Sequence, residues 1–348
     1  MEEIKFLTEG KIVAGRWKII KKLGEGGMGA VFKVEDKRRK NFMAAMKVES
    51  DISDGGVLKL EVHVLKELAP LKNVVRLIDS GQRDKYCFMV MTMLGVDLMH
   101  LKRLAGKPFS QSTILRIAMA TLYAIKQIHE AGFTHRDIKP GNCVSGLVGG
   151  DMRCFYLIDY GMVRAFIQTD KHGTNSLRKP REGDQLFRGT PRYCSLNTHY
   201  RKEQGRVDDL WSWLFMLVEL HVGLPWRRLT DEREILKVKE STKTEDLFRK
   251  CPNEFRNLYD YLNTLKFASR PDYFGMWSEC FAGLKRAKGS FLDKFEWEPE
   301  APPPDVQTAL SISEKDLTEF KPTKRTVMGK KLYPYASAAN FKENILKM

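Results

Sequence analysis

The amino-acid sequence predicts an α+β fold in which a small β-rich part with one main helix precedes a larger, mostly helical part. Between residues 17 and 48 the apolar residues alternate in short runs separated by Gly-rich and charged breaks, as in an antiparallel sheet. Residues 57–68 then repeat apolar side chains at helical spacing. From Ser110 onward the patterns become long and helical. A chain of 348 residues can bury a sizeable core in this arrangement.

The β-rich part is expected to contain five strands around the helix of residues 57–68. Its first three strands lie in the runs WKIIKKLG, AVFKVED and FMAAMKV. The turn Asp54-Gly55-Gly56 precedes the helix, and the runs VVRLIDSG and YCFMVMTML after Pro70 predict two more strands.

The helical part begins with QSTILRIAMATLYAIKQIHEAG, which has Ser110 at its start and Gly132 as a C-cap. Further helices are predicted in LWSWLFMLVEL and around residues 255–265 and 273–284. After Trp297 the chain becomes Pro-rich and its apolar clusters thin out. Residues 299–348 are therefore expected to form a flexible tail, mostly without a core of its own.

Composition excludes several classes of protein. Apolar residues at 43% and charged residues at 30% are typical of a soluble globular chain. The acidic start MEEIKFLTEGK lacks the features of a signal peptide, and the most apolar stretch is interrupted by Glu219 and His221, so no membrane insertion is expected. Six scattered cysteines without a C-x-x-C pair indicate neither a zinc site nor a disulfide framework. A net charge of +15 predicts an acidic partner of some kind, without selecting one.

The segment LGEGGMGAVF contains the spacing G-x-G-x-x-G at Gly24, Gly26 and Gly29. Such glycines let backbone amides approach phosphate groups closely. A dinucleotide-binding fold would need a helix directly after Gly29, whereas AVFKVED is a strand, so we expect a hairpin tip that covers phosphates. Alone, the motif could equally be a Gly-rich surface turn.

Lys47 and Glu61 form the second candidate feature. Lys47 ends an alternating strand eighteen residues after Gly29, where an ammonium group could hold the α- and β-phosphates. Glu61 lies on the following helix among apolar neighbours, where a carboxylate needs a cationic partner. Lys47 is the natural partner.

The third feature is the run His135-Arg136-Asp137-Ile138-Lys139-Pro140-Gly141-Asn142, which fits H-R-D-x-x-x-x-N. Asp159-Tyr160-Gly161 follows seventeen residues after Asn142 and ends the strand-like run FYLID. Residues of these types at this spacing fit phosphoryl transfer. Asp137 would take a hydroxyl proton, Lys139 would neutralise charge on the transferred phosphoryl group, and Asn142 and Asp159 would bind magnesium.

Five matches in the correct order resemble the protein kinase family from about Trp17 to Lys285. The resemblance implies a two-lobed fold with an extension at residues 1–16, a kinase domain at 17–298 (N-lobe about 17–91, hinge 92–95, C-lobe 96–298) and the tail at 299–348. It also implies ATP and Mg²⁺ as cofactors. The residues expected to contact the nucleotide are Leu23, Gly24, Glu25, Gly26, Gly27, Met28, Gly29, Val31, Ala45, Lys47, Met91, Thr92, Met93, Leu94, Val144 and Ile158. The resemblance further implies a stack of apolar side chains inside the domain, and Asp209 is expected to anchor the base of this stack.

Three segments indicate which group within the protein kinase family the chain resembles. Phe187 to His199, Leu224 to Arg227 and Arg270 to Tyr273 resemble the casein kinase 1 group, and the first of them together with Asp208-Asp209-Leu210-Trp211-Ser212 is most similar to the tau-tubulin kinases. The resemblance implies transfer to Ser or Thr hydroxyls, because Lys139 and Thr190 are present. The glutamate that usually pairs with Arg270 is missing, so another acceptor is required.

Substrate choice is expected to depend on an anion site formed by Arg188, Arg192 and Arg227, which would favour acidic or phosphorylated protein substrates. The lysine that the family places in this region is replaced by Thr230. The alternative is a solvated basic face. Thr169, Thr174 and Ser176 lie in the activation segment, and the resemblance implies activity without their phosphorylation.

Two other functions remain open. A pseudokinase that binds nucleotide as a scaffold usually lacks one of Lys47, Asp137 and Asp159, and all three are present. No RNA or DNA motif interleaves aromatic and basic residues, so no specific nucleic acid is expected. We expect a monomer in the cytoplasm or the nucleus.

Overall fold

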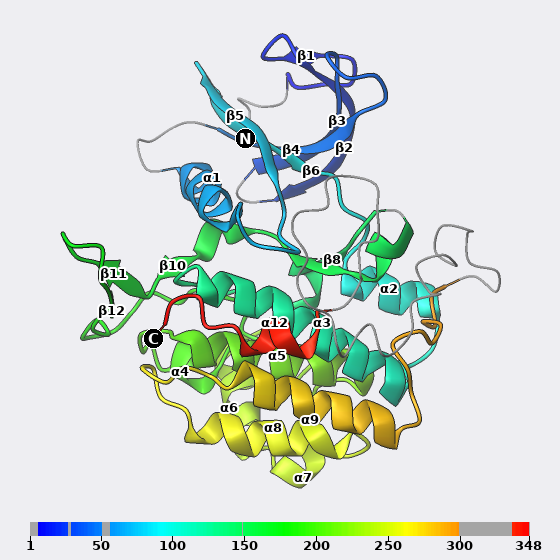
Figure 1. Ribbon diagram of the computed structural model, residues 1–348, viewed down its shortest axis with the longest axis vertical. Helices are drawn as coiled ribbons and strands as arrows, with labels where there is room; N and C mark the ends of the chain where they lie inside the picture. Colours follow the sequence, from blue (N-terminus) through cyan, green and yellow to red (C-terminus); the bar gives the residue numbers. More distant parts are fainter. Residues whose placement is uncertain (1–5, 27–28, 51–55, 148, 299–335, 348) are drawn as a thin grey trace. The chain divides into compact units, whose positions relative to one another are not determined.

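The computed structural model describes residues 6–26, 29–50, 56–147, 149–298 and 336–347. The chain divides into two compact units. The first contains the residues up to Leu94 together with Ile158–Val163, and the second contains Gly95–Leu157 and the chain from Arg164 onward. The predicted α+β fold is confirmed, with a β-rich sheet and one helix first and mostly helices afterwards (Figure 1). The limits of the domains stay predictions.

The first unit is built on a six-stranded sheet in the order β1-β2-β3-β4-β6-β5, in which every neighbouring pair is antiparallel. Five of its strands match the predicted runs, and the short β1 was not predicted. The bounds are β1 Ile12–Val13, β2 Trp17–Gly26, β3 Gly29–Asp36, β4 Met43–Ser50, β5 Leu77–Arg83 and β6 Tyr86–Thr92.

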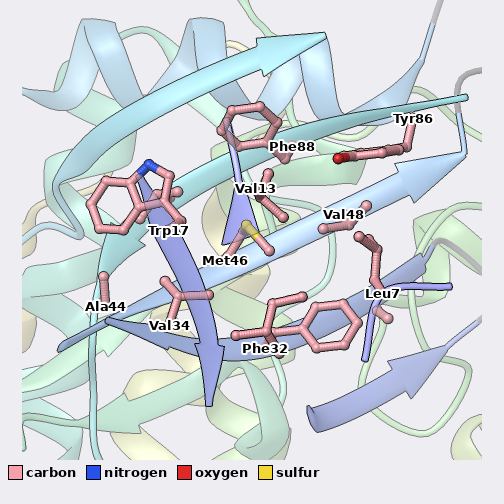
Figure 2. Packing of buried hydrophobic residues seen from close by; sticks show 13 residues of the cluster. Leu7, Val13, Trp17, Phe32, Val34, Ala44, Met46, Val48, Tyr86 and Phe88 are labelled. Atoms are coloured by element: carbon pink, nitrogen blue, oxygen red, sulfur yellow. The ribbon is translucent and has the colours of Figure 1, made fainter. Parts of the chain in front are cut away.

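A cluster of buried apolar side chains covers one face of this sheet (Figure 2). Phe32 from β3 and Met46 from β4 lie in it, as expected from the alternation of these strands. Leu7 and Val13 also belong to the cluster and are 5% and 1% exposed. The segment before Trp17 therefore contributes to the core of the first unit.

Among the described residues of the first unit, the α-helix is α1 (Val57–Leu68), which confirms the predicted helix of residues 57–68. Its buried side chains are Leu58, Val64, Leu65, Leu68 and, as the one charged member, Glu61. The helix packs against the short 3-10 turn η4 (Tyr160–Met162), which belongs to the same unit. This packing brings Glu61 close to the segment that carries Asp159.

The second unit is built around α3 (Gln111–Glu130), which is buried along most of its length. The Ser110 hydroxyl accepts a hydrogen bond from the N–H of Thr113 at 3.2 Å, as expected for an N-cap. Gly132 follows the helix with φ of +86°, a conformation that favours glycine. The other described helices of eight or more residues in this unit are α2 Leu98–Ala105, α5 Arg206–His221, α6 Glu232–Ser241, α8 Asn253–Thr264 and α9 Tyr273–Arg286.

Short elements connect these helices and carry the candidate site. Apart from the strand in the run FYLID, they were not predicted, because segments of two to five residues show no usable periodicity. The strands form the pairs β7–β10, β8–β9 and β11–β12. Their bounds are β7 Phe133–Thr134, β8 Cys143–Ser145, β9 Phe155–Leu157, β10 Arg164–Ala165, β11 Ile167–Thr169 and β12 Asn175–Leu177. The short helical segments are η2 Pro140–Asn142, η3 Gly149–Arg153, α4 Leu196–His199 and α7 Thr244–Leu247.

The C-terminal end of the predicted tail packs on the second unit. Residues 336–347 include α12 (Ala338–Lys342), drawn in red in Figure 1, which packs against α9. Phe341 is 2% exposed, and its ring contacts those of Tyr123 and Trp277 at centroid distances of 5.5 and 5.8 Å. Residues 299–335 lie outside the described residues. The final segment of the tail thus takes part in the core of this unit.

The six cysteines form no disulfide. Among the described residues no three His, Cys, Asp or Glu side chains lie together as a metal-binding group. None of the helices described is both long enough and apolar enough to span a membrane.

Candidate active site

The Gly-rich segment is the tip of the β2–β3 hairpin, as predicted from the strand that follows Gly29. Gly24, Glu25 and Gly26 pair with Val31, Ala30 and Gly29 across the hairpin. Gly29 has φ of +130°, and a Cβ atom there would lie 2.0 Å from the carbonyl oxygen of Val48. Only glycine fits this position. Gly27 and Met28, also predicted to contact the nucleotide, lie outside the described residues.

The first unit brings together Lys47, Glu61 and Asp159. The Lys47 ammonium forms an ion pair with Glu61 and lies 3.3 Å from Oδ1 of Asp159. Burial alone would lower the pKa of Lys47, but the two carboxylates outweigh it and raise that pKa above the usual value. Lys47 is therefore held in its charged form, with the Glu61 side chain only 1% exposed and the Asp159 side chain 38% exposed.

Strand register places four predicted nucleotide contacts on one face of the sheet. Val31 is paired with Lys47, and Ala45 with Met91. Since cross-strand partners and residues two apart share a face, these four side chains project from the face opposite Phe32. This face carries an apolar surface next to one ammonium group.

The other predicted contacts are distributed over both units. Thr92 ends β6, and Met93 and Leu94 follow it, all three half-buried. Leu23 is 41% exposed, Val144 on β8 of the second unit is 6% exposed, and Ile158 belongs to the first unit.

The second unit assembles Asp137, Lys139 and Thr190. The Lys139 ammonium lies 2.6 Å from Oδ2 of Asp137, and the Thr190 hydroxyl donates to Oδ1 at 2.7 Å. Lys139 also donates to the Thr190 oxygen at 3.4 Å. Asp137 is 4% exposed. Both carboxylate oxygens therefore have defined partners, although Thr190 follows Asp137 by 53 residues.

Asn142 completes the group and fits a role as a metal ligand. Its Nδ2 donates to the carbonyl oxygen of Asp137 at 2.9 Å and to Oδ2 at 3.1 Å. These two bonds direct the amide oxygen away from Asp137. Amide and carboxylate oxygens are ligands that Mg²⁺ prefers, so the chemistry of Asn142 and Asp159 fits this ion.

Asp209 on α5 holds the backbone of this loop. Its carboxylate accepts hydrogen bonds of 2.7 Å from the N–H groups of both His135 and Arg136, and Arg136 has φ of +67°. Although burial would raise the pKa of Asp209, the hydrogen bond from His129 and the nearby imidazoles lower it below the usual value. Asp209 therefore stays ionised and stabilises a backbone conformation that is rare for arginine. The sequence predicted Asp209 as an anchor, but not the two backbone hydrogen bonds that its carboxylate accepts.

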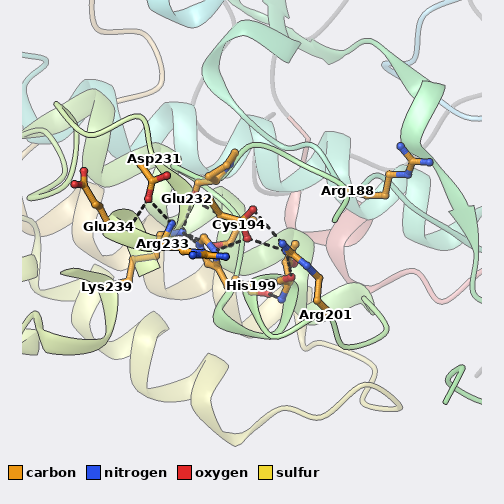
Figure 3. Close-up of polar contacts among 12 residues, drawn as sticks. Arg188, Cys194, His199, Arg201, Asp231, Glu232, Arg233, Glu234 and Lys239 are labelled. Carbon is orange, nitrogen blue, oxygen red and sulfur yellow. Dashed lines mark hydrogen bonds and ion pairs between the residues drawn. The ribbon is translucent and has the colours of Figure 1, made fainter. Parts of the chain in front are cut away.

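The three arginines of the predicted anion site lie in the second unit. The indole N–H of Trp226 donates to the carbonyl oxygen of Arg192 at 2.8 Å, which places the segments of Arg192 and Arg227 side by side. The carbonyl oxygen of Arg188 accepts from Gln204 at 2.9 Å. Figure 3 shows the Arg188 side chain apart from Cys194, His199 and Lys239. The structure brings these arginines onto one unit, and their joint action stays a proposal.

Sequence reasoning missed Lys239 on α6. Its ammonium donates to the carbonyl oxygens of Pro191 and Cys194 at 2.8 and 2.6 Å and lies 3.2 Å from Nε2 of His199 (Figure 3). Lys239 is 7% exposed, and this burial lowers its pKa to about 8. The helix pattern EILKVKES holds two lysines of the same kind, so no local signal could single this one out. Lys239 fixes the segment that directly follows Thr190.

Arg270 finds its partner in Glu130 at the end of α3. The guanidinium lies 2.7 Å from Oε1 of Glu130, whose side chain is 3% exposed. The acceptor that the sequence could not name is therefore a carboxylate 140 residues earlier in the chain.

Comparison with known proteins agrees with this arrangement. Residues 17–280 match the protein kinase domain. A putative serine/threonine-protein kinase of Caenorhabditis elegans is 40% identical over 84% of this chain and 85% of that protein. A putative casein kinase I of the same organism is 33% identical over 84% of this chain and 86% of its own length. An inactive tau-tubulin kinase of C. elegans is 31% identical over 72% of this chain and 90% of its own length.

This chain belongs to the protein kinase family. Membership implies ATP binding and protein substrates. The predicted kinase fold is confirmed.

Proposed function

We propose that this chain is a serine/threonine protein kinase of the casein kinase 1 group, most similar to the tau-tubulin kinases. It transfers the γ-phosphoryl group of Mg-ATP to Ser and Thr hydroxyls of protein substrates. The observation that carries the proposal is the hydrogen-bonded group of Asp137, Lys139 and Thr190, because it positions one carboxylate and one ammonium for this chemistry.

In this reaction Asp137 accepts the proton of the substrate hydroxyl as its oxygen forms a bond to the γ-phosphorus. The bond between that phosphorus and the β–γ bridging oxygen breaks, and ADP leaves. Thr190 and Lys139 hold the two oxygens of Asp137 in place, so that the carboxylate loses little freedom when the substrate binds. Lys139 also offers positive charge to the transferred group.

Lys47 is the residue we assign to the α- and β-phosphates. Its pairing with Glu61 fixes the ammonium at the edge of the sheet face that carries Val31 and Ala45. The apolar side chains of this face would contact the adenine ring. Bound magnesium would neutralise charge on the phosphates, with Asn142 and Asp159 as its protein ligands.

The assignment to Ser and Thr rests on Lys139 and Thr190 together. Their mutual hydrogen bond and their shared contact with Asp137 support a single functional unit. The relatives named as serine/threonine-protein kinase and casein kinase I support the same specificity. Assays on matched peptides with Ser, Thr or Tyr at the target position test it, and equal transfer to Tyr would contradict it.

A preference for acidic or phosphorylated substrates is the finer part of the proposal. The contact between Trp226 and Arg192 supports it, because it holds two of the three arginines in neighbouring segments. Peptides with phosphoserine, aspartate or alanine upstream of the target provide the test. The phosphoserine peptide should be phosphorylated fastest by the native chain and lose this advantage in Arg192→Gln. Arg249→Gln is the matched control, because this arginine is an exposed member of a surface ion pair.

A nucleotide-binding pseudokinase is the alternative. It is favoured by one observation, the relative that is named inactive. The presence of Lys47, Asp137 and Asp159 argues against a pseudokinase. The side chains of Lys47 and Asp159 are in contact with each other.

The deciding experiment measures incorporation of γ-phosphate from Mg-ATP into casein by the purified chain. Asp137→Asn should abolish transfer while keeping the fold, because asparagine has the same shape and no basic carboxylate. Asp260→Asn on the exposed side of α8 is the control and should leave transfer unchanged. Nucleotide binding without any transfer by the native chain would establish the pseudokinase instead.

A further inference from the structure

The C-terminal segment, residues 336–347, contacts a surface that α3 and α9 form in the second unit. Phe341 is its anchor, because the buried ring packs against Tyr123 on α3 and Trp277 on α9. Trp277 also stacks on Phe281, one turn later in α9, at a centroid distance of 5.0 Å. Aromatic rings packed in this way contribute much of the binding energy of a short segment. The surface therefore offers an aromatic pocket for one side chain.

Two charged side chains hold the backbone of the segment. Arg270 donates a hydrogen bond of 3.2 Å to the carbonyl oxygen of Glu343. Glu130 accepts bonds of 2.6 and 3.3 Å from the backbone N–H groups of Ile345 and Leu346. Hydrogen bonds to ionised groups are stronger than those between neutral groups. Because both side chains bind backbone groups, they recognise the path of the segment rather than its side chains.

Lys126 on α3 adds a charge requirement at the same surface. Its side chain is fully buried, and its ammonium lies 3.5 Å from Oε1 of Glu130. Burial lowers the pKa of Lys126, whereas the charges of Glu130 and then Glu343 raise it. The segment thus brings a second carboxylate toward a buried ammonium group.

The segment has the features of a bound peptide. Residues 299–335, which lie outside the described residues, join it to the rest of the second unit. Within the segment, α12 has five residues and a capping box formed by Ser337 and Asn340. An isolated helix of this length is not stable in water. The segment therefore depends on the surface for its helical form, as does a peptide that folds on binding.

The residues that hold the segment adjoin those that hold the catalytic loop. His129, beside Glu130 on α3, contacts the hydroxyl of Tyr273 at 2.6 Å and the carboxylate of Asp209 at 2.9 Å. Asp209 accepts the bonds from two backbone N–H groups just before Asp137. A change at Glu130 therefore reaches the loop of the proposed base through one neighbouring residue and one hydrogen-bonded carboxylate.

We propose that the surface of α3 and α9 is a peptide-binding site, that the chain fills it with its own residues 336–347, and that its occupation positions the catalytic loop. The binding goes beyond the proposed kinase function, and the effect on turnover rests on that function. The occupied site supplies Glu130 with two backbone donors and Trp277 with a stacked ring. The vacant site loses these contacts, so the end of α3 beside His129 is held less firmly.

The first test measures binding of a fluorescent peptide of residues 336–347 to the full chain by anisotropy. Phe341→Ala weakens the chain's own segment, so the peptide should bind this variant at least about 10-fold more tightly than the native chain, whose site is occupied. A peptide with Phe341→Ala should bind neither protein. A peptide with Ile345→Ala is the matched control and should bind like the native peptide, since this side chain is exposed. Equal binding of the native peptide to both proteins, or to neither, would overturn the proposal.

The second test locates the peptide through its backbone contacts. Phe341→Ala combined with Glu130→Gln should bind it about 10-fold more weakly than Phe341→Ala alone, because the charged acceptor of two N–H groups is lost. Phe341→Ala combined with Glu245→Gln, which removes an exposed carboxylate of the same unit, is the matched control. Equal affinity in both double variants would place the peptide away from Glu130 and contradict the assigned site.

Casein phosphorylation tests the effect on the catalytic loop. Phe341→Ala should lower kcat by about 3- to 10-fold with the KM for ATP within about twofold, and saturating peptide should restore kcat. The assay is run well below the unfolding midpoint of the variant, so that the peptide does not act by raising the folded fraction. The Phe341→Ala peptide should restore nothing. Full occupancy by the native peptide without a change in kcat would overturn the positioning of the loop.

Hydrogen exchange on the native chain covers the case in which Phe341→Ala does not fold. The amides of Ile345 and Leu346 should exchange faster than those in the middle of α3, and an excess of unlabelled peptide should accelerate them further. Equal protection of the segment and α3 would overturn the proposal. If the native chain transfers no phosphate while the peptide still binds, the kinase function fails and the peptide site stands.

Discussion

Glu130 and Arg270 form an ion pair of 2.7 Å in the second unit, and the Glu130 side chain is almost fully buried. The same carboxylate accepts hydrogen bonds from the backbone N–H groups of Ile345 and Leu346, at 2.6 and 3.3 Å. One residue at the end of α3 therefore binds both the Arg270 segment and the C-terminal segment.

Glu130→Gln should lower the free energy of unfolding by about 3 kcal/mol, because it removes one charge from a buried pair and weakens two further bonds. Urea unfolding followed by circular dichroism measures the change. Glu245→Gln, an exposed member of a surface pair, should leave the stability close to that of the native chain. Equal stability of both variants would show that Glu130 does not support this region.

Phe341 should contribute to stability although it lies in the predicted tail. Phe341→Ala leaves a cavity between Tyr123 and Trp277 and should lower the free energy of unfolding by about 3 kcal/mol. Removal of residues 336–348 should have at least this effect. Ile345→Ala is the control, since Ile345 is 49% exposed. A truncated chain that unfolds at the native urea concentration would contradict the packing of α12.

Glu61→Gln should lower kcat/KM for ATP by about 10- to 100-fold, because the Lys47 ammonium loses its charged anchor. Steady-state kinetics at varied ATP concentration measure the effect. Glu67→Gln lies on the exposed side of the same helix and should behave like the native chain. An unchanged ATP dependence in Glu61→Gln would show that Lys47 is held by other contacts.

Thr190→Ala should lower kcat roughly tenfold, because one hydrogen bond that orients Asp137 disappears. Thr190→Ser keeps the hydroxyl and should keep most of the activity. The pair of variants separates the hydroxyl from the methyl group of Thr190. Loss of activity in both would point to packing around Thr190 rather than to the bond with Asp137.

His199 should make the fold sensitive to acid. Its side chain is fully buried beside Lys239 and Glu232 on α6, and burial, followed by the charge of Lys239, lowers its pKa from 6.5 to about 4. As the pH falls below 6.5, the unfolded chain binds a proton that the folded chain does not. The free energy of unfolding should therefore fall between pH 6.5 and pH 4, by ~3 kcal/mol at most.

Urea unfolding at several pH values across this range measures the slope for the native chain. His199→Gln should have a flatter profile, because glutamine binds no proton. Acidic side chains contribute slopes of their own below about pH 5, so the comparison is made on the difference between the two proteins. Identical profiles would mean that His199 does not titrate in this window.

The elements of the fold were predictable wherever the apolar residues repeat regularly over many positions. The runs that became β2 to β6, the helix Val57–Leu68 and the helix Gln111–Glu130 were all predicted, because their apolar spacing extends over several turns or strand residues. The helix α6 was missed because charged residues dominate its pattern. α12 was missed because five residues are too few to show a period and the flanking sequence is Pro-rich.

The residues of the candidate site were likewise predictable only where the signal is local in the sequence. Lys47, Asp137, Asn142 and Asp159 stand in short motifs with fixed spacing, so local sequence alone predicts them as candidates. The contacts of Lys239 and Glu130 depend on partners elsewhere in the chain, and 140 residues separate Glu130 from Arg270. A single glutamate at the end of a helix looks the same in sequence whether it faces water or an arginine.

By itself, the sequence determined the α+β class, the order of the main elements and the motif residues of a kinase, because each of these depends on local spacing. Only the tertiary structure decided which carboxylate satisfies Arg270, which carbonyl oxygens accept from Lys239, and that Phe341 is buried. These outcomes depend on distance in space and on exclusion of water, and both arise only when segments far apart in the chain pack together.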